Sequence, residues 1–190
     1  KWPYPITIVF GKPIAEPKNA DEVRLAIEKL DACAAVMDAH KKLIPPRRLL
    51  RNCRRGARRG KAADSTGMEA TGGQLLTSAL ALRRTLRREV LDADEKNVGV
   101  LLPPTVAGMA VNAALAVDCR VSVNLNYSVN SSDVVNDCIR QAGIRHVITS
   151  RRVMERLELS LQAELVFVED LKAKIAVSDK LLGFAQARII

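Results

Sequence analysis

The chain has 190 residues, of which 48% are hydrophobic and 27% charged, and its formal net charge is +9. That apolar content excludes intrinsic disorder, while only 10 Gly and 8 Pro exclude collagen-like and low-complexity sequence. The longest largely apolar run, residues 105–117, includes Asn112 and is too short to span a bilayer. The first residues have neither a Met nor the layout of a signal peptide, so the chain is expected to be part of a longer protein.

The positive charge is concentrated in one segment. Ten basic residues and no acidic residue lie between Asp38 and Asp64, whereas the rest of the chain is nearly neutral. Seven of the ten are arginines: Arg47, Arg48, Arg51, Arg54, Arg55, Arg58 and Arg59.

Three interpretations of this segment stay open. It can contact nucleic-acid phosphates, although it contains no aromatic residue for base stacking. It can lie on an anionic membrane surface, with an apolar side made of Leu43, Ile44, Leu49 and Leu50. It can also be a plain solvated linker.

The four cysteines, Cys33, Cys53, Cys119 and Cys138, include no Cys-x-x-Cys pair. The two histidines, His40 and His146, are not spaced to complete a ligand set with them. The sequence therefore predicts no zinc site, and it favours reduced thiols in a cytosolic setting.

The first elements in chain order are a strand over residues 6–10 and a helix over 19–40 that Asn19 caps. One apolar stripe follows the helix: Val23, Ala26, Ile27, Leu30, Ala34 and Met37. Pro45 and Pro46 are predicted to stop any helix, and residues 45–62 are interpreted as a basic linker. Gly67 to Gly73 is predicted to form a hairpin and a helix start, in which Thr71 and Gln74 have capping-box spacing.

From there strands alternate with helices, which predicts an α/β fold with a mainly parallel sheet covered on both faces. The predicted strands are 97–102, 120–125, 146–149 and 165–168; the predicted helices are 75–90, 105–117, 132–142, 151–157 and 171–190.

The sequence points to no catalytic, cofactor-binding or metal-binding residue. The glycines at 67, 72 and 73 are not followed by Lys-Ser/Thr, and no Gly-x-Gly-x-x-Gly is present. Neither histidine has the Asp five positions later that an acyltransferase base needs, so His146 is expected to be a buried or strand-end residue. The acidic run 92–95 is interpreted as a solvated turn.

Four stretches, 63–76, 98–104, 112–128 and 141–151, carry a family resemblance through their order and spacing. They resemble the start of the acyl-adenylate-forming (AMP-binding) superfamily, specifically the synthetase half of bifunctional 2-acylglycerophosphoethanolamine acyltransferase/acyl–acyl carrier protein synthetases. Residues 1–44, with Pro5 to Pro13 as a last strand, resemble the end of a glycerolipid acyltransferase domain. The implied organisation is an acyltransferase-like end (1–44), a basic linker (45–62) and the N-terminal, incomplete portion of an AMP-binding synthetase domain (63–190).

The resemblance implies a parent protein that uses ATP and Mg²⁺ to convert a fatty acid to an acyl-adenylate and then acylates the thiol of acyl carrier protein. Its other half would re-acylate a lysophospholipid at the cytoplasmic side of the membrane. The family's phosphate loop, ribose-binding Asp and catalytic Lys are absent from these 190 residues, so the fragment is expected to be inactive. The arginines would then face an anionic membrane or an acidic carrier protein. The alternative is a non-enzymatic basic α/β module that binds nucleic acid or anionic membrane.

Overall fold

The structure is a computed structural model, and it describes residues 8–37, 44–126, 128 and 131–189. The chain separates between Ile44 and Pro45 into two units.

The first unit contains helix α1, Ala20–Met37, and its predicted cap is confirmed. The side chain of Asn19 accepts a hydrogen bond from the backbone N–H of Glu22, at 2.9 Å. No residue of α1 is buried, and Ile27 and Met37 of the predicted apolar stripe are largely exposed. The predicted strand 6–10 is not formed at residues 8–10, and Ile6 and Thr7 lie outside the described residues. A single strand without a partner leaves its backbone groups unpaired.

Helix α2, Pro45–Arg55, corrects the interpretation of residues 45–62 as a linker. Proline is tolerated in the first helical turn, where its missing N–H has no intrahelical partner, so Pro45 and Pro46 begin a helix and do not stop one. Leu49, Leu50 and Cys53 share one side of α2 and pack into the core of the second unit. Only 2% of the surface of Cys53 is exposed.

Strands β1, Gly60–Ala63, and β2, Glu69–Thr71, form the predicted antiparallel hairpin. Gly67 in its turn has φ +81°, which favours glycine. Helix α3, Gly72–Glu89, follows directly, and both hydrogen bonds of the predicted Thr71–Gln74 capping box are present. The sequence pattern was sufficient for this cap because all partners are local.

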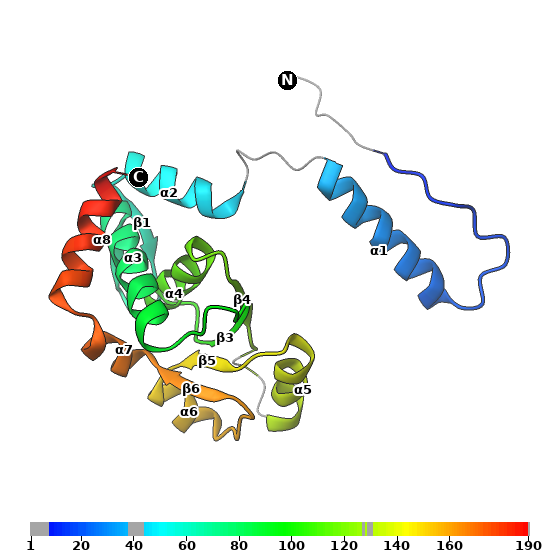
Figure 1. The fold of residues 1–190 in the computed structure, drawn as a ribbon. Helices are drawn as coiled ribbons and strands as arrows, with labels where there is room; N and C mark the ends of the chain where they lie inside the picture. The colour runs from blue at the N-terminus through cyan, green and yellow to red at the C-terminus, as the bar shows by residue number, and fades with distance from the viewer. Residues whose placement is uncertain (1–7, 38–43, 127, 129–130, 190) are drawn as a thin grey trace. The chain divides into compact units, whose positions relative to one another are not determined.

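The central sheet has the order β4-β3-β5-β6, and all three strand pairs are parallel. Its strands are β3 Asn97–Leu101, β4 Val121–Asn124, β5 His146–Thr149 and β6 Glu164–Phe167. The connecting helices are α4 Val106–Val117, α5 Ser132–Ala142 and α6 Arg151–Leu157. The predicted α/β class with a parallel sheet is confirmed (Figure 1).

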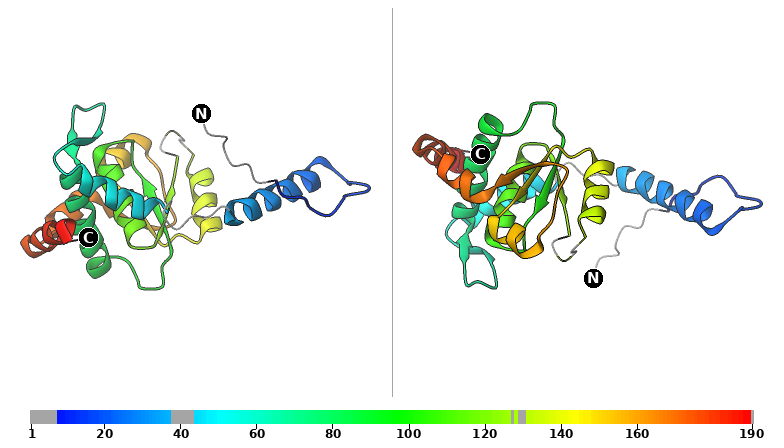
Figure 2. Two further views of the ribbon diagram at one scale, coloured as in Figure 1. Left: turned by 90° about the horizontal axis from the view of Figure 1, so that it is seen from above. Right: turned by 90° about the horizontal axis from the view of Figure 1, so that it is seen from below.

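Helices lie on both sides of this sheet (Figures 1 and 2), and an apolar cluster covers each of its faces. On one face Val100 and Ile148 contact residues of α3 and α4. On the other face Val147 contacts Ile139 of α5 and its neighbours. Burial on both faces explains why β5 is an uninterrupted buried run.

The predicted helical end consists of two helices, α7 Val168–Lys174 and α8 Val177–Ile189. Helix α8 packs closely on α3 at Gly183, where an added Cβ would lie 3.1 Å from the carbonyl oxygen of Thr77. Within the described residues, no helix combines the length and hydropathy needed to cross a membrane.

Candidate functional site

The arginine face of α2 is the first candidate site. Arg47, Arg51, Arg54 and Arg55 follow helical spacing and line an open hollow of about 640 Å³ together with Leu50. Arg48, Arg58 and Arg59 are partly or fully exposed as well. Because the opposite side of α2 is held in the core by Leu49 and Cys53, the helix presents these guanidinium groups outward.

Three arginines of this face are not neutralised by neighbouring acids. In the described part of the chain, no Asp or Glu forms an ion pair with Arg47, Arg51 or Arg55. The arginines of α3 differ: Arg83 and Arg87 pair with Asp118, and Arg84 and Arg88 pair with Asp179. The positive charge of α3 is therefore used inside the fold, whereas the charges of Arg47, Arg51 and Arg55 on α2 are available to a partner.

Cys53 lies beneath this face and is a core residue. Burial raises the pKa of its thiol, and the nearby charge of Lys61 lowers it by less. The thiol therefore stays protonated and unreactive near neutral pH. Cys33, Cys119 and Cys138 are exposed, so Cys53 is the buried one among the four cysteines.

The carboxyl ends of the parallel strands are the second candidate, because open α/β sheets bind ligands there. The chain passes from β3 to β4 on one side and then crosses to β5 on the other side of β3. The crevice therefore lies between the carboxyl ends of β3 and β5. The amino terminus of α4 lies after β3, but Asp64 already accepts a hydrogen bond from the backbone N–H of Val106, at 2.9 Å. The hydroxyl of Thr66 and the Val106 N–H lower the pKa of Asp64, so its carboxylate stays charged in this position.

The other polar groups near this edge are also paired internally. Ser150 caps α6 by accepting from the backbone N–H of Val153, and the amides of Asn112 and Asn124 bond each other. Arg151 forms a 2.8 Å ion pair with Asp170 and stacks on the ring of Phe167. These contacts hold the strand ends in place, and they form no nucleophile–base pair.

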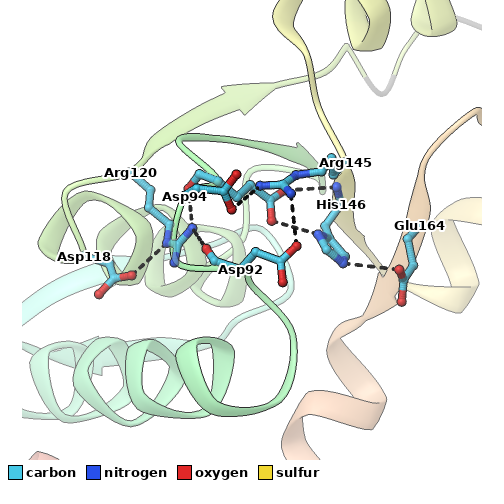
Figure 3. Close-up of polar contacts among 8 residues, drawn as sticks. Asp92, Asp94, Asp118, Arg120, Arg145, His146 and Glu164 are labelled. Carbon is cyan, nitrogen blue, oxygen red and sulfur yellow. Dashed lines mark hydrogen bonds and ion pairs between the residues drawn. The ribbon is translucent and has the colours of Figure 1, made fainter.

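A polar network at the opposite, amino edge of the sheet was not predicted (Figure 3). The buried ring of His146 lies between two carboxylates: Nδ1 is 2.8 Å from Oε2 of Glu95, and Nε2 is 3.3 Å from Oε2 of Glu164. The backbone N–H of His146 also donates to Glu95. The interpretation of residues 92–95 as a solvated turn is therefore wrong for Glu95, because only 1% of its side chain is exposed.

Two arginines complete this network (Figure 3). Arg145 bonds Asp92 and Asp94 at 3.1 and 3.0 Å, and this pairing lowers the pKa of Asp94 and raises that of Arg145. Arg120 bonds Asp118 and donates to the backbone carbonyls of Asp92 and Glu95. The network joins the 92–95 loop to the amino ends of β4, β5 and β6.

The expectation that His146 is a buried strand-end residue is confirmed. Its two carboxylate partners could not be found from local spacing, because Glu95 is 51 residues away and Glu164 aligns with His146 only through the β5–β6 register. A His between carboxylates has acid–base character, but this one is buried at the edge away from the crevice. We therefore assign it to the framework. His40 lies outside the described residues.

The described residues contain no group of three or more His, Cys, Asp or Glu side chains that could hold a metal ion. Residues 67–73, the glycine-containing stretch, form a hairpin and a capped helix start, so their backbone N–H groups do not cradle a phosphate.

Comparisons with known proteins support the fold. No family model matches the chain, and no curated protein sequence matches it significantly. Among solved structures, VinN with 3-methylaspartate is similar with a TM-score of 0.60 and 21% identity, over 72% of this chain and 37% of VinN. A fatty acyl CoA synthetase from Mycobacterium tuberculosis gives 0.58 and 17%, over 72% and 29% of the two chains. NpsA-ThdA from Klebsiella oxytoca, an artificially fused adenylation–PCP di-domain, gives 0.56 and 17%, over 69% and 24%.

The chain thus shares its α/β fold with part of each of these structures, in agreement with the fold that the sequence resemblance predicted. It spans between 24% and 37% of the length of these three structures.

Proposed function

We propose that these residues belong to an ATP-dependent ligase that activates a fatty acid as an acyl-adenylate and transfers the acyl group to the thiol of a carrier protein. The observation that carries the proposal is the sequential order of hairpin, capped helix α3 and sheet β4-β3-β5-β6, in a fold similar to fatty acyl CoA synthetase and adenylation structures. The early motifs of the resemblance occupy these same elements.

In this proposal the chain supplies framework, while catalytic groups come from other parts of the ligase. Adenylation gives the carboxylate a good leaving group for thiol attack. The framework residues hold the carboxyl ends of β3 and β5 in register, through contacts such as Thr149 to the carbonyl of Leu101, at 2.9 Å. The proposed parent also includes a lysophospholipid acyltransferase, with residues 1–44 as its end.

The test is fatty-acid-dependent ATP–pyrophosphate exchange. The full-length protein that contains these residues is expected to catalyse ATP–pyrophosphate exchange when long-chain fatty acids are added. The 190-residue chain alone is expected to show no exchange. Exchange by the 190-residue chain would contradict its framework role. A full-length protein that binds fatty acid but never exchanges would contradict the ligase assignment.

The arginine face of α2 is proposed to bind the acidic carrier protein. Leu49 and Leu50, two of the four residues expected to supply an apolar side for membrane insertion, pack partly against the core, so the arginines are the main exposed groups around Leu50. Electrostatic complementarity of this kind raises association rates and depends on salt. The adenylation–PCP fusion among the similar structures supports a carrier protein as the occupant.

A matched pair of double variants tests this face. Arg51→Glu with Arg55→Glu changes two residues four apart on α2, while Arg152→Glu with Arg156→Glu makes the same change of charge on the exposed side of α6. Only the α2 pair is expected to weaken carrier binding, by roughly tenfold at low salt. Equal effects of both pairs would contradict a specific face.

Nucleic acid is the second candidate partner, and the same exposed arginines favour it. In that case affinity for duplex DNA would fall steeply with salt and would be lost in the α2 double variant. Anionic vesicles, bound in proportion to their charge, would identify a membrane surface as the partner.

A further inference from the structure

A groove in the second unit has the composition of a lipid-binding site. It lies between α3, α4, α7 and α8, next to the tip of the β1–β2 hairpin, and has a volume of about 420 Å³. This volume falls within the range of about 300–1,000 Å³ that is typical of small-molecule sites. Its lining is mainly aliphatic: Met68, Ala81, Leu82, Val106, Ala107, Ala110, Val111, Val168 and Ile175.

The groove exists because its floor is made of small residues. Ala81 and Ala110 are almost completely buried and come from facing positions on α3 and α4. The pairing of two alanines leaves room that larger side chains would fill. The hairpin adds Met68, whose flexible side chain is 58% exposed and can adapt to an aliphatic ligand.

Two lysines give this apolar groove a charged rim. Lys172 on α7 and Lys180 on α8 both line it and are exposed, and neither ammonium group forms an ion pair within the described residues. No acidic residue lines the groove in this part of the chain. An aliphatic channel bordered by cations alone matches an anionic amphiphile with one long hydrocarbon chain.

We propose that this groove binds a long-chain fatty acid, with the alkyl chain between α3 and α4 and the carboxylate at Lys172 and Lys180. The choice of ligand rests on the proposed function, since a fatty acid is its substrate class. The groove reaches the amino terminus of α4 at Val106, so a fatty acid held there before activation would lie beside the β3–β5 crevice. Binding requires neither ATP nor Mg²⁺.

The experiment is a titration of the 190-residue chain with a fluorescent long-chain fatty acid, followed by displacement with unlabelled saturated fatty acids. Saturable binding is expected to tighten by roughly fourfold for each methylene that enters the groove. The corresponding fatty alcohols are expected to bind more weakly, because they carry no charge for the lysines.

Variants separate the groove from other apolar surfaces. Lys172→Gln with Lys180→Gln is expected to weaken fatty-acid binding by roughly tenfold and to leave alcohol binding unchanged. Lys174→Gln is the control, because Lys174 lies on the same helix α7 but lines a different hollow with Glu89 and Asp170. Ala107→Phe should block the groove and abolish binding of both ligands, with circular dichroism as the check of folding.

Absence of saturable binding, or binding that the Lys172/Lys180 substitutions do not weaken, would contradict the proposed fatty-acid site. These outcomes are distinguishable from failure of the ligase assignment. If the full-length protein shows fatty-acid-dependent ATP–pyrophosphate exchange but the 190-residue chain binds no fatty acid, only the groove proposal is contradicted. If the 190-residue chain binds fatty acid but the full-length protein shows no ATP–pyrophosphate exchange, only the ligase assignment is contradicted.

Discussion

Asp179 anchors the start of α8 to α3 through several partners at once. Only 1% of its side chain is exposed, and it forms ion pairs with Arg84 and Arg88 at 3.3 and 2.9 Å. It also accepts from the backbone N–H of Ala176 at 3.2 Å, as the third residue of a helix does in a capping box. Burial alone would raise the pKa of Asp179, but the bonds from Arg88, Ala176 and Arg84 outweigh it and lower the pKa.

This lowered pKa predicts a pH-dependent cost for Asp179→Asn. The stabilisation is fully present above the unfolded pKa of about 3.9 and is lost as pH falls through the lower folded value. The variant should therefore have a lower urea midpoint than the parent at pH near 7, and the difference should shrink under acidic conditions. Exposed Asp133→Asn, measured alongside, should differ little at either pH. If the difference in urea midpoint between Asp179→Asn and the parent persisted in acid, the stabilisation would not depend on the charge of Asp179.

Gly72 marks a contact between elements that tolerates no side chain. A Cβ at this position would lie 2.5 Å from the carbonyl oxygen of Cys53 and 2.7 Å from that of Gly56. The backbone N–H of Gly72 also donates to the carbonyl of Arg59. The end of α2 and the start of α3 can therefore approach only because residue 72 is glycine.

Replacing Gly72 by Ala should destabilise the second unit by about 1–3 kcal/mol, the usual cost of overpacking. Gly60→Ala is the matched control, because nothing lies within 4 Å of an added Cβ there. Urea unfolding curves give both free energies. Comparable losses in the two variants would show that contact with α2 is not the cause.

At the scale of elements, local signals predicted most of the second unit. The cap of α3 and the left-handed stop at Gly143 involve only residues within a few positions of each other, so a short sequence pattern is enough to indicate them. Helix α2 was missed because proline is compatible with both the end and the start of a helix. Only contact with the core, through Leu49 and Cys53, distinguishes the two cases.

If α2 is an integral part of the second unit, Leu49→Ala should cost about 1–3 kcal/mol of unfolding free energy, less than a fully buried leucine. Arg48→Ala, one residue away and exposed, should be nearly neutral. Thermal or urea denaturation measures both. A neutral result at Leu49 would restore the interpretation of this segment as a linker.

At the scale of the whole molecule, the division at Ile44 and Pro45 predicts independent stability. Helix α1 buries none of its residues, whereas the second unit holds all three apolar clusters of the described residues. Residues 45–190 alone should therefore unfold with the same urea midpoint and the same cooperativity as the complete chain. A lower midpoint after removal of residues 1–44 would mean that these residues stabilise the second unit.

The sequence by itself determined the periodic features of this protein: the alternation of buried strands with helices, the capping residues, and the segment that holds the positive charge. These depend on neighbours in the chain and on the repeat of apolar positions. Tertiary structure decided which charges are used internally, since Arg88 and Asp179 or Glu95 and His146 meet only when distant elements pack. It likewise decided that α2 is part of the core and that small residues of α3 and α4 leave a lysine-rimmed groove, because space between helices depends on pairs of residues that no local pattern specifies.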